Sequence, residues 1–339
     1  MEHGENMNIQ KIIFASVVLV ASACGGGGGG SNESTTTLAI IEPNPPAEQG
    51  LTIENYMEVL ALAFINGFGL SNPVEDFFFG ADFGPVDEEF EFECDSGSAV
   101  ISLNFSTEGL AENDSVVLTS DDCVSTEFDN SQSRTSSILT YTVTDLTGAV
   151  TTGTPFTLTF LADTSAIIEE FAGPFAPQLI TSDGTFEYVV NSDGITETTM
   201  ITSQPDSRST IAVDGARFEF GGAFNTRQVL DSSNQMFLLE SSSSFALLTS
   251  RTNGDFEVQT DEAFTGIFDL DAVDNDDNIL FMPDAGSISI TDGLGGIATL
   301  TAISNSMAEL AVDLDNDLIP ETTAVMTYVE LENLADNLF

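Results

Sequence analysis

Residues Ser136–Asp145 read SSILTYTVTD, and their alternation of apolar and polar side chains predicts a β-strand with one buried face. The same period of two recurs from about residue 98 onward, in segments rich in Thr, Val, Ile and Phe. The further segments are Ser98–Phe105, Phe156–Phe160, Thr185–Val190, Ala216–Phe220, Met236–Ser241, and then SISIT, IATLTA, AELAVD and AVMTYVEL towards the end of the chain.

Turn signals separate these segments at intervals of roughly 8–12 residues. They are Asp183-Gly184, Asp193-Gly194, Asp214-Gly215, Asn253-Gly254 and Asp292-Gly293. We therefore expect an all-β fold, a large antiparallel meander of roughly 14–18 strands that forms a curved sheet or an open barrel. The meander and one helix would make a single domain over residues 51–339, with Pro174–Pro177 as the place where two β lobes could divide.

One helix is expected before the strands, at about residues 53–67, where it would pack on the sheet. Thr52 is suited to cap its first turn, and no second segment shows strong helical periodicity. The apolar positions at helical spacing are Ile53, Tyr56, Met57, Leu60 and Phe64, whereas Glu54, Asn55 and Glu58 lie off that stripe.

The N-terminus has the pattern of an export signal. Ile12–Ala23 is an apolar run of 12 residues behind Lys11, which is too short to span a bilayer but fits a signal-peptide core. We expect residues 1–23 to be a signal peptide, with Met7 as the better start because Glu2 and Glu5 do not suit a positively charged leader.

Ala21-Ser22-Ala23-Cys24 resembles the lipobox of bacterial lipoproteins, in which the cysteine receives lipid, such as palmitate, before cleavage. Six glycines follow at Gly25–Gly30, so residues 24–50 would be a lipidated cysteine and a flexible tether reaching roughly 25–30 Å. Because Gly25 rather than Asp follows the cysteine, the resemblance implies attachment to the outer membrane. The alternative is an ordinary secretory peptide in which Cys24 has no role.

Cys94 and Cys123 are the pair that remains after lipidation of Cys24. An exported protein meets an oxidising environment, so a disulfide is expected, and two free thiols are the alternative. Closing a loop of this length would stabilise the fold by roughly 3–4 kcal/mol in the chain-entropy model.

The segment from Cys94 through Glu112-Asn-Asp-Ser-Val-Val-Leu-Thr to Cys123, together with the acidic turn after Val312, resembles Gly-tethered, β-rich outer-membrane lipoproteins of Gram-negative bacteria. The resemblance covers the leader, the helix and these two regions, and it carries no assigned activity or catalytic residues. Asn113-Asp114 replaces the family's usual Gly-Asp, and Leu318 stands where a glycine is common.

Composition excludes several classes of function. The chain carries 55 acidic and 6 basic side chains, a net charge of −49, which argues against a nucleic-acid partner. The only histidine is His3 and the only lysine is Lys11, both ahead of the expected cleavage site. A mature chain therefore lacks the imidazole of a catalytic triad and the lysine of a Schiff base or phosphate loop.

Carboxylates and hard cations remain as candidate chemistry. Asp313, Asp315, Asp317, the backbone carbonyl of Ile319 and Glu321 occupy positions 1, 3, 5, 7 and 9 of a calcium loop of the EF-hand kind. Position 6 is Leu318 rather than glycine, and position 12 is Ala324 rather than glutamate. A solvated hairpin turn is the alternative. A second, looser acidic group spans Asp269–Asp277.

Taken together, these features predict an outer-membrane lipoprotein without enzymatic activity, with a structural or binding role in the envelope and no cofactor other than a candidate calcium ion. The Phe77–Phe79 run, surrounded by acidic residues, is either the buried face of a sheet or the mouth of a groove for lipid or peptide. One alternative is a surface-displayed adhesion or matrix module stabilised by calcium. The other is a carboxylate-dependent hydrolase, although Asp95-Ser96-Gly97 occurs once and an aspartic protease needs two such aspartates.

Overall fold

The computed structural model describes residues 40–41, 50–68, 86–106, 110–126, 131–150, 154–173, 177–221, 225–231, 233, 236–267 and 283–336. Two helices are present in this part of the chain, α2 (Tyr56–Phe68) and α4 (Tyr328–Asp336). The strands are β1 (Val86–Phe92), β2 (Ser96–Phe105), β3 (Ser115–Thr126), β4 (Gln132–Gly148), β5 (Phe156–Ala172), β6 (Gln178–Ser192), β7 (Thr196–Ser203), β8 (Arg208–Val213), β9 (Ala216–Gly221), β10 (Asn225–Asp231), β11 (Met236–Leu248), β12 (Asn253–Ile267), β13 (Ala285–Asp292), β14 (Ile297–Ser304), β15 (Met307–Asp313) and β16 (Thr322–Thr327).

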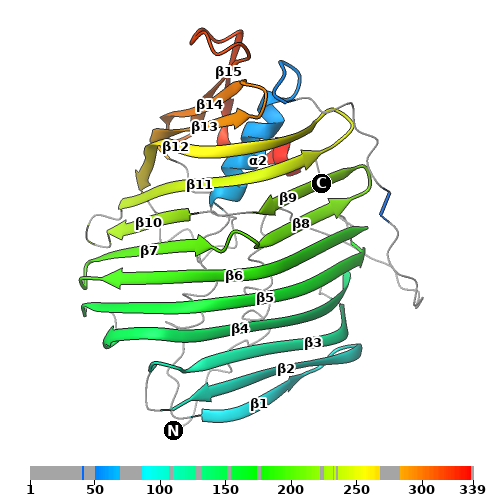
Figure 1. The fold of residues 1–339 in the computed structure, drawn as a ribbon, viewed down its shortest axis with the longest axis vertical. Helices are drawn as coiled ribbons and strands as arrows, with labels where there is room; N and C mark the ends of the chain where they lie inside the picture. Colours follow the sequence, from blue (N-terminus) through cyan, green and yellow to red (C-terminus); the bar gives the residue numbers. More distant parts are fainter. Residues whose placement is uncertain are drawn as a thin grey trace.

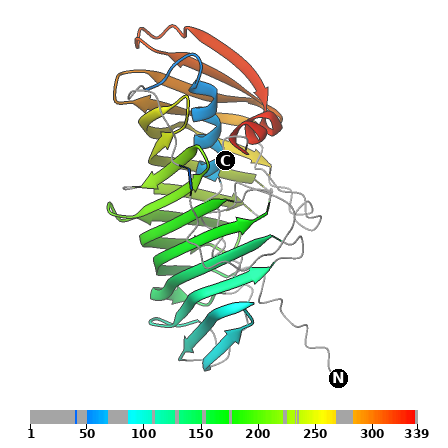
Figure 2. The ribbon, with the colours of Figure 1, turned by 90° about the vertical axis from the view of Figure 1, so that its right-hand side faces the viewer.

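All sixteen strands belong to one antiparallel sheet, which confirms the predicted all-β meander (Figure 1). The sheet is open, because in the described pairing β1 is joined only to β2 and β16 only to β15. It is curved, and β13–β16 arch over the helices in the side view (Figure 2). Strands β5 and β6 pair from Glu170–Gln178 onward, so the sheet continues past the Pro174–Pro177 position.

The turns between strands fall on two opposite sides of the sheet. We call one the entry side; it is formed by the carboxyl ends of β1, β3, β5, β8, β11, β13 and β15, as the strand registers show. Two of the first described residues are bound on this side. Ile41 exchanges hydrogen bonds with the β8–β9 turn at Asp214 and Gly215, and the amide of Leu51 donates to Asp292 Oδ2 at 2.6 Å.

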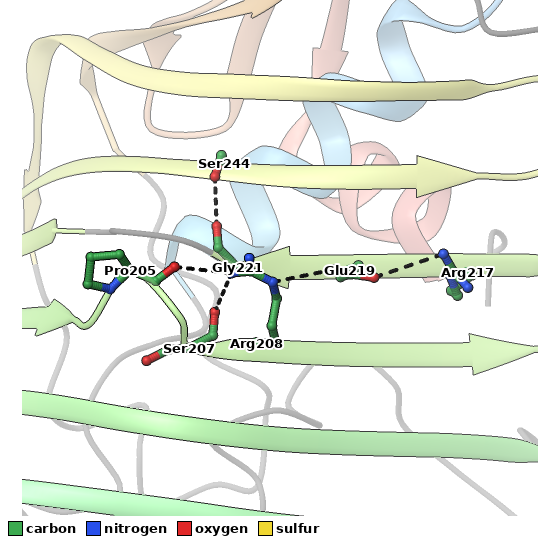
Figure 3. Close-up of polar contacts among 7 residues, drawn as sticks. All are labelled: Pro205, Ser207, Arg208, Arg217, Glu219, Gly221 and Ser244. Atoms are coloured by element: carbon green, nitrogen blue, oxygen red, sulfur yellow. Dashed lines mark hydrogen bonds and ion pairs between the residues drawn. The ribbon is translucent and has the colours of Figure 1, made fainter.

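The middle of the sheet contains a seam where two rows of the ladder are each made of two short strands. β7 and β8 both pair with β6, and β10 and β9 both pair with β11. Figure 3 shows how polar contacts close this seam. Arg208 Nη1 donates to the carbonyls of Pro205 (3.3 Å) and Ser207 (2.9 Å), and Ser244 Oγ donates to the carbonyl of Gly221 (2.7 Å).

Asp183-Gly184 lies inside β6 at this seam, so its assignment as a turn was wrong. Gly184 has φ +148°, and a Cβ there would come within 2.6 Å of the Cα of Ser207. The Ser207 hydroxyl also accepts the amide of Thr185 and donates to its carbonyl. The glycine is required by this close approach between neighbouring segments rather than by a reversal of the chain. Asn253-Gly254, also predicted as a turn, begins β12 and pairs with the end of β11.

The inner face of the sheet carries two apolar clusters. One lies on β2–β7 and includes Leu158, Phe160 and Tyr188. The other lies on β9 and β11–β15, where α2 and α4 cover it and pack against each other (Figure 2). Phe220 of β9 packs against both clusters, so they meet near the seam.

Helix α2 confirms the predicted N-terminal helix but begins later, at Tyr56. Thr52 Oγ1 accepts the amide of Asn55, and Asn55 Oδ1 accepts the amide of Thr52, which is the reciprocal arrangement of a capping box. The residue expected to open the apolar stripe, Ile53, lies ahead of the helix and is exposed. Asn55, expected off the stripe, is fully buried, and its side-chain Nδ2 donates to the carbonyl of Gly50.

Glu58 was also expected on the polar face of α2, yet its side chain is only 8% exposed. Arg251, in the β11–β12 turn, compensates its charge: Nη1 lies 2.8 Å from Glu58 Oε1. This ion pair joins the first turn of α2 to the sheet. Its arginine end is 68% exposed, so solvent screens part of the attraction.

Helix α4 was not predicted, because the AVMTYVEL segment alternates like a strand. Strand β16 ends at Thr327, whose amide and hydroxyl both donate to Glu330 Oε2 while Thr327 Oγ1 accepts the Glu330 amide. This capping box starts a helix immediately after the strand. Tyr328 then stacks on Phe64 of α2 with ring centroids 5.3 Å apart, and its buried hydroxyl donates to the carbonyl of Pro283. Burial raises the pKa of this phenol well above its ordinary value.

Replacing Arg251 by Ala should lower the free energy of unfolding by about 1–3 kcal/mol, because the buried Glu58 carboxylate loses its cation. Chemical denaturation of the wild type, R251A, E58Q and the double variant measures the coupling. The double variant should lose less free energy of unfolding than the sum of the losses in R251A and E58Q. Additive losses would mean that the ion pair does not hold the helix to the sheet.

The capping hydrogen bonds from Thr327 hold the pKa of Glu330 below its ordinary value. A carboxyl whose folded pKa is depressed stabilises the fold above its unfolded pKa, and this stabilisation is lost as pH falls through the folded pKa. The wild type should therefore be more stable than E330Q at pH 7, and the difference should shrink as the pH falls below about 4.5. Paired thermal melts from pH 7 to pH 3 test this, since the large background charge is common to both proteins.

Candidate metal centre in the β15–β16 turn

The predicted calcium loop forms the turn between β15 and β16. Asp313 is the last residue of β15 and is buried beside Ile297 of β14. Its carboxylate accepts two amides of the turn, from Asp317 at 3.3 Å and from Leu318 at 2.7 Å. Asp313 therefore holds the turn closed through these two hydrogen bonds.

Two further acidic side chains stabilise the same turn. Asp317 Oδ1 accepts the amide of Ile319 at 2.9 Å, and Glu321 Oε2 accepts the amide of Leu314 at 2.7 Å. Side chains that accept nearby amides in this way favour tight turns. The structure thus brings Ile319 and Glu321 into the predicted loop as partners of its internal hydrogen bonds.

Asp313, Asp315 and Asp317 form a group in which one carboxylate oxygen of each lies within 4.8 Å of the others. It is the one such group of three potential ligands in the described ranges, and Glu321 is not part of it. Three carboxylates at this separation repel each other unless water screens them or a cation lies between them. Oxygen ligands of this kind suit a hard cation such as calcium.

The backbone explains why the missing glycine does not abolish the loop. Leu318 has φ +68° and Asn316 has φ +56°, so both adopt the left-handed conformation that usually favours glycine or asparagine. Asn113, which also stands in place of a glycine in the resembling family, has φ +71°. Both departures from the pattern keep the conformation that the glycine would supply.

The other predicted site residues are placed as follows. Cys94 and Cys123 form a disulfide that joins the segment before β2 to β3, which confirms the predicted pairing. Asp95 accepts the hydroxyl of Thr126 and its amide donates to the carbonyl of Val124, so Asp95 is bound to the end of β3, while Ser96 and Gly97 begin β2. Cys24, Phe77–Phe79 and Asp269–Asp277 lie outside the described residues.

Comparison with known proteins gives no relative: no family model, curated protein or solved structure matches the chain. Neither helix in the described part of the chain combines the length and hydrophobicity needed to cross a bilayer. The function must therefore be inferred from the residues of this chain.

Calcium binding is tested by thermal melting in EDTA, in millimolar calcium and in magnesium at equal ionic strength. If the turn binds calcium at 100 times its dissociation constant, the folded state gains about 2.7 kcal/mol. The exposed Asp315, for which the structure gives no hydrogen bond, is the informative residue: D315N should abolish a calcium-specific rise in Tm without destabilising the protein in EDTA.

Asp313→Asn is the matched control for the turn itself. It should destabilise the protein in EDTA as well, because a neutral amide accepts the amides of Asp317 and Leu318 more weakly than a carboxylate does. Equal shifts in calcium and magnesium, unchanged in D315N, would mean that the three aspartates form a solvated turn.

Proposed function

We propose that this protein is a non-enzymatic lipoprotein anchored in the outer membrane through lipid on Cys24. The observation that carries the proposal is the Cys94–Cys123 disulfide. The sequence has three cysteines, so this bond leaves Cys24 as the one thiol available for modification. That thiol directly follows a signal-like apolar run and precedes six glycines.

The chemistry of the chain supports a role other than catalysis. Beyond Cys24 the sequence contains no histidine and no lysine, and its five arginines each form an ion pair with an acidic side chain. Arg134 lies between Asp122 and Glu169, and Arg227 lies 2.8 Å from Glu240. Four of these cations join neighbouring segments, whereas Arg217 pairs with Glu219 inside β9. Their pairing makes all five poor candidates for binding a substrate anion.

The sheet favours a structural or surface-binding role in the envelope. Apolar side chains on the inner face are buried in the two clusters, so an acyl chain could enter only by displacing protein packing. The outer face is polar and rich in Ser and Thr, as in the row Ser115, Thr142, Leu161, Glu187 and Thr202. A peptide or glycan partner would meet this hydroxyl-rich face.

A second candidate function is that of a displayed module stabilised by calcium. It is favoured by Asp315, an exposed carboxylate that lies beside Asp313 and Asp317 and has no described role in holding the turn. In this version calcium would stiffen the β15–β16 turn.

Lipid attachment is tested by expressing the full chain with its own leader in a Gram-negative host. The membrane fraction should contain the protein, and mass spectrometry should find an N-terminal peptide that begins at Cys24 and carries acyl groups. C24S, the control, should be released from the membrane, while the Cys94–Cys123 disulfide stays intact. An unmodified Cys24 in a membrane-free protein would contradict the proposal.

A further inference from the structure

Two neighbouring turns expose large aliphatic side chains to water. Leu294 in the β13–β14 turn is 72% exposed, and Leu318 and Ile319 in the β15–β16 turn are 83% and 68% exposed. Single exposed aliphatic residues are common on protein surfaces and need no explanation. The relevant feature here is that these three occupy adjacent turn tips, where small or polar residues usually lie.

Both turns lie on the entry side of the sheet. Ile297, which directly follows the β13–β14 turn, pairs with Asp313, which directly precedes the β15–β16 turn. With strands about 4.8 Å apart, the two turns are about 10 Å from each other. The start of α2 and the β15–β16 turn lie together at the top of Figure 1.

The first described residues of the chain are bound to this same side. Ile41 is bound at the β8–β9 turn, and Leu51 is bound to Asp292, two residues before Leu294. Cys24 precedes Ile40 by 16 residues, a length with a root-mean-square reach of roughly 20–24 Å for a flexible tether. A lipid on Cys24 would therefore keep the entry side, rather than the opposite side, close to the bilayer.

We propose that the entry side docks on the bilayer that holds the anchor, with Leu294, Leu318 and Ile319 at the boundary between headgroups and acyl chains. The proposal rests on the proposed lipid anchor at Cys24 and adds the orientation of the domain to it. A lipid chain and a small apolar surface together give firmer attachment than either one alone.

The charges of these turns specify the lipid. Asp315 and Asp317 are exposed beside Leu318, and the partly exposed Asp292 lies two residues before Leu294. Carboxylates at the contact repel an anionic surface. The partner is therefore a zwitterionic phospholipid surface, for which phosphatidylethanolamine-rich vesicles serve as the probe.

Because the sequence contains no tryptophan, one introduced tryptophan reports on its own surroundings. The test uses the full chain, purified from membranes and reconstituted into phosphatidylethanolamine-rich vesicles with brominated acyl chains. Leu294→Trp and Ile319→Trp place the reporter on the entry side. Ile195→Trp is the matched control, because Ile195 is 58% exposed in the β6–β7 turn on the opposite side.

We expect the emission of both entry-side reporters to shift to shorter wavelength and to be quenched by brominated lipid, whereas the Ile195→Trp reporter keeps the emission of a water-exposed indole. Leu318→Trp is the substitute if either variant melts earlier than the wild type. Equal quenching on both sides, or no quenching at the entry side, would overturn the proposal. Vesicles with added anionic lipid should reduce the quenching at the entry side.

The mass of the Cys24 peptide, measured on the same samples, separates this proposal from the proposed anchor. If Cys24 carries no lipid, the anchor proposal fails. Docking can then be tested by coupling the Cys24 thiol to a maleimide-headgroup lipid in the same vesicles, since the other two cysteines are in a disulfide. Under artificial anchoring, the same pattern of quenching would support the docking side and its absence would overturn it.

Discussion

The fold depends on an uninterrupted ladder of backbone hydrogen bonds between neighbouring strands, from β1 to β16. Where the ladder would break, at the junctions of β7 with β8 and of β9 with β10, side chains replace the missing backbone partners. Arg208 donates to two carbonyls, Ser207 both accepts and donates, and Ser244 donates to the carbonyl of Gly221. Buried backbone groups need hydrogen-bond partners, and at the seam these side chains supply them.

The open sheet leaves one apolar face that must be covered. Helices α2 and α4 cover the part of this apolar face that lies on β11–β15. The two helices contact each other where Tyr328 stacks on Phe64. The Arg251–Glu58 ion pair then fixes α2 to a turn of the entry side. Both helices therefore lie against the β11–β15 part of the sheet, and α2 is fixed at its first turn to the entry side.

The acidic composition is compatible with this fold because the charges are distributed. Among the described residues, all carboxylates except Glu58, Asp114 and Asp313 are at least partly exposed, so water and salt screen them. The few that are buried have assigned partners: Asp114 accepts two amides and a hydroxyl, Asp313 accepts two amides, and Glu58 has an arginine. Asp114 and Asp313 thus stabilise turns by accepting backbone amides. A bound cation could add to this stabilisation but is not needed for these hydrogen bonds.

The sequence by itself determined the strand-rich class, the N-terminal helix predicted at about residues 53–67 and the positions of three of the five predicted Gly-containing turns, because these depend on local periodicity and backbone preference. The Cys94–Cys123 pairing was expected from the number of cysteines once Cys24 was assigned to lipidation. It did not determine the role of Gly184. The sequence predicts a turn there, but in the structure Gly184 lies inside β6, where Ser207 approaches its backbone closely. The periodicity also misplaced Ile53, Asn55 and Glu58, and it concealed α4, whose start depends on one capping box. Only the tertiary structure decided which turns share a side and which carboxylates meet, because those relations depend on strand register between residues far apart in the chain.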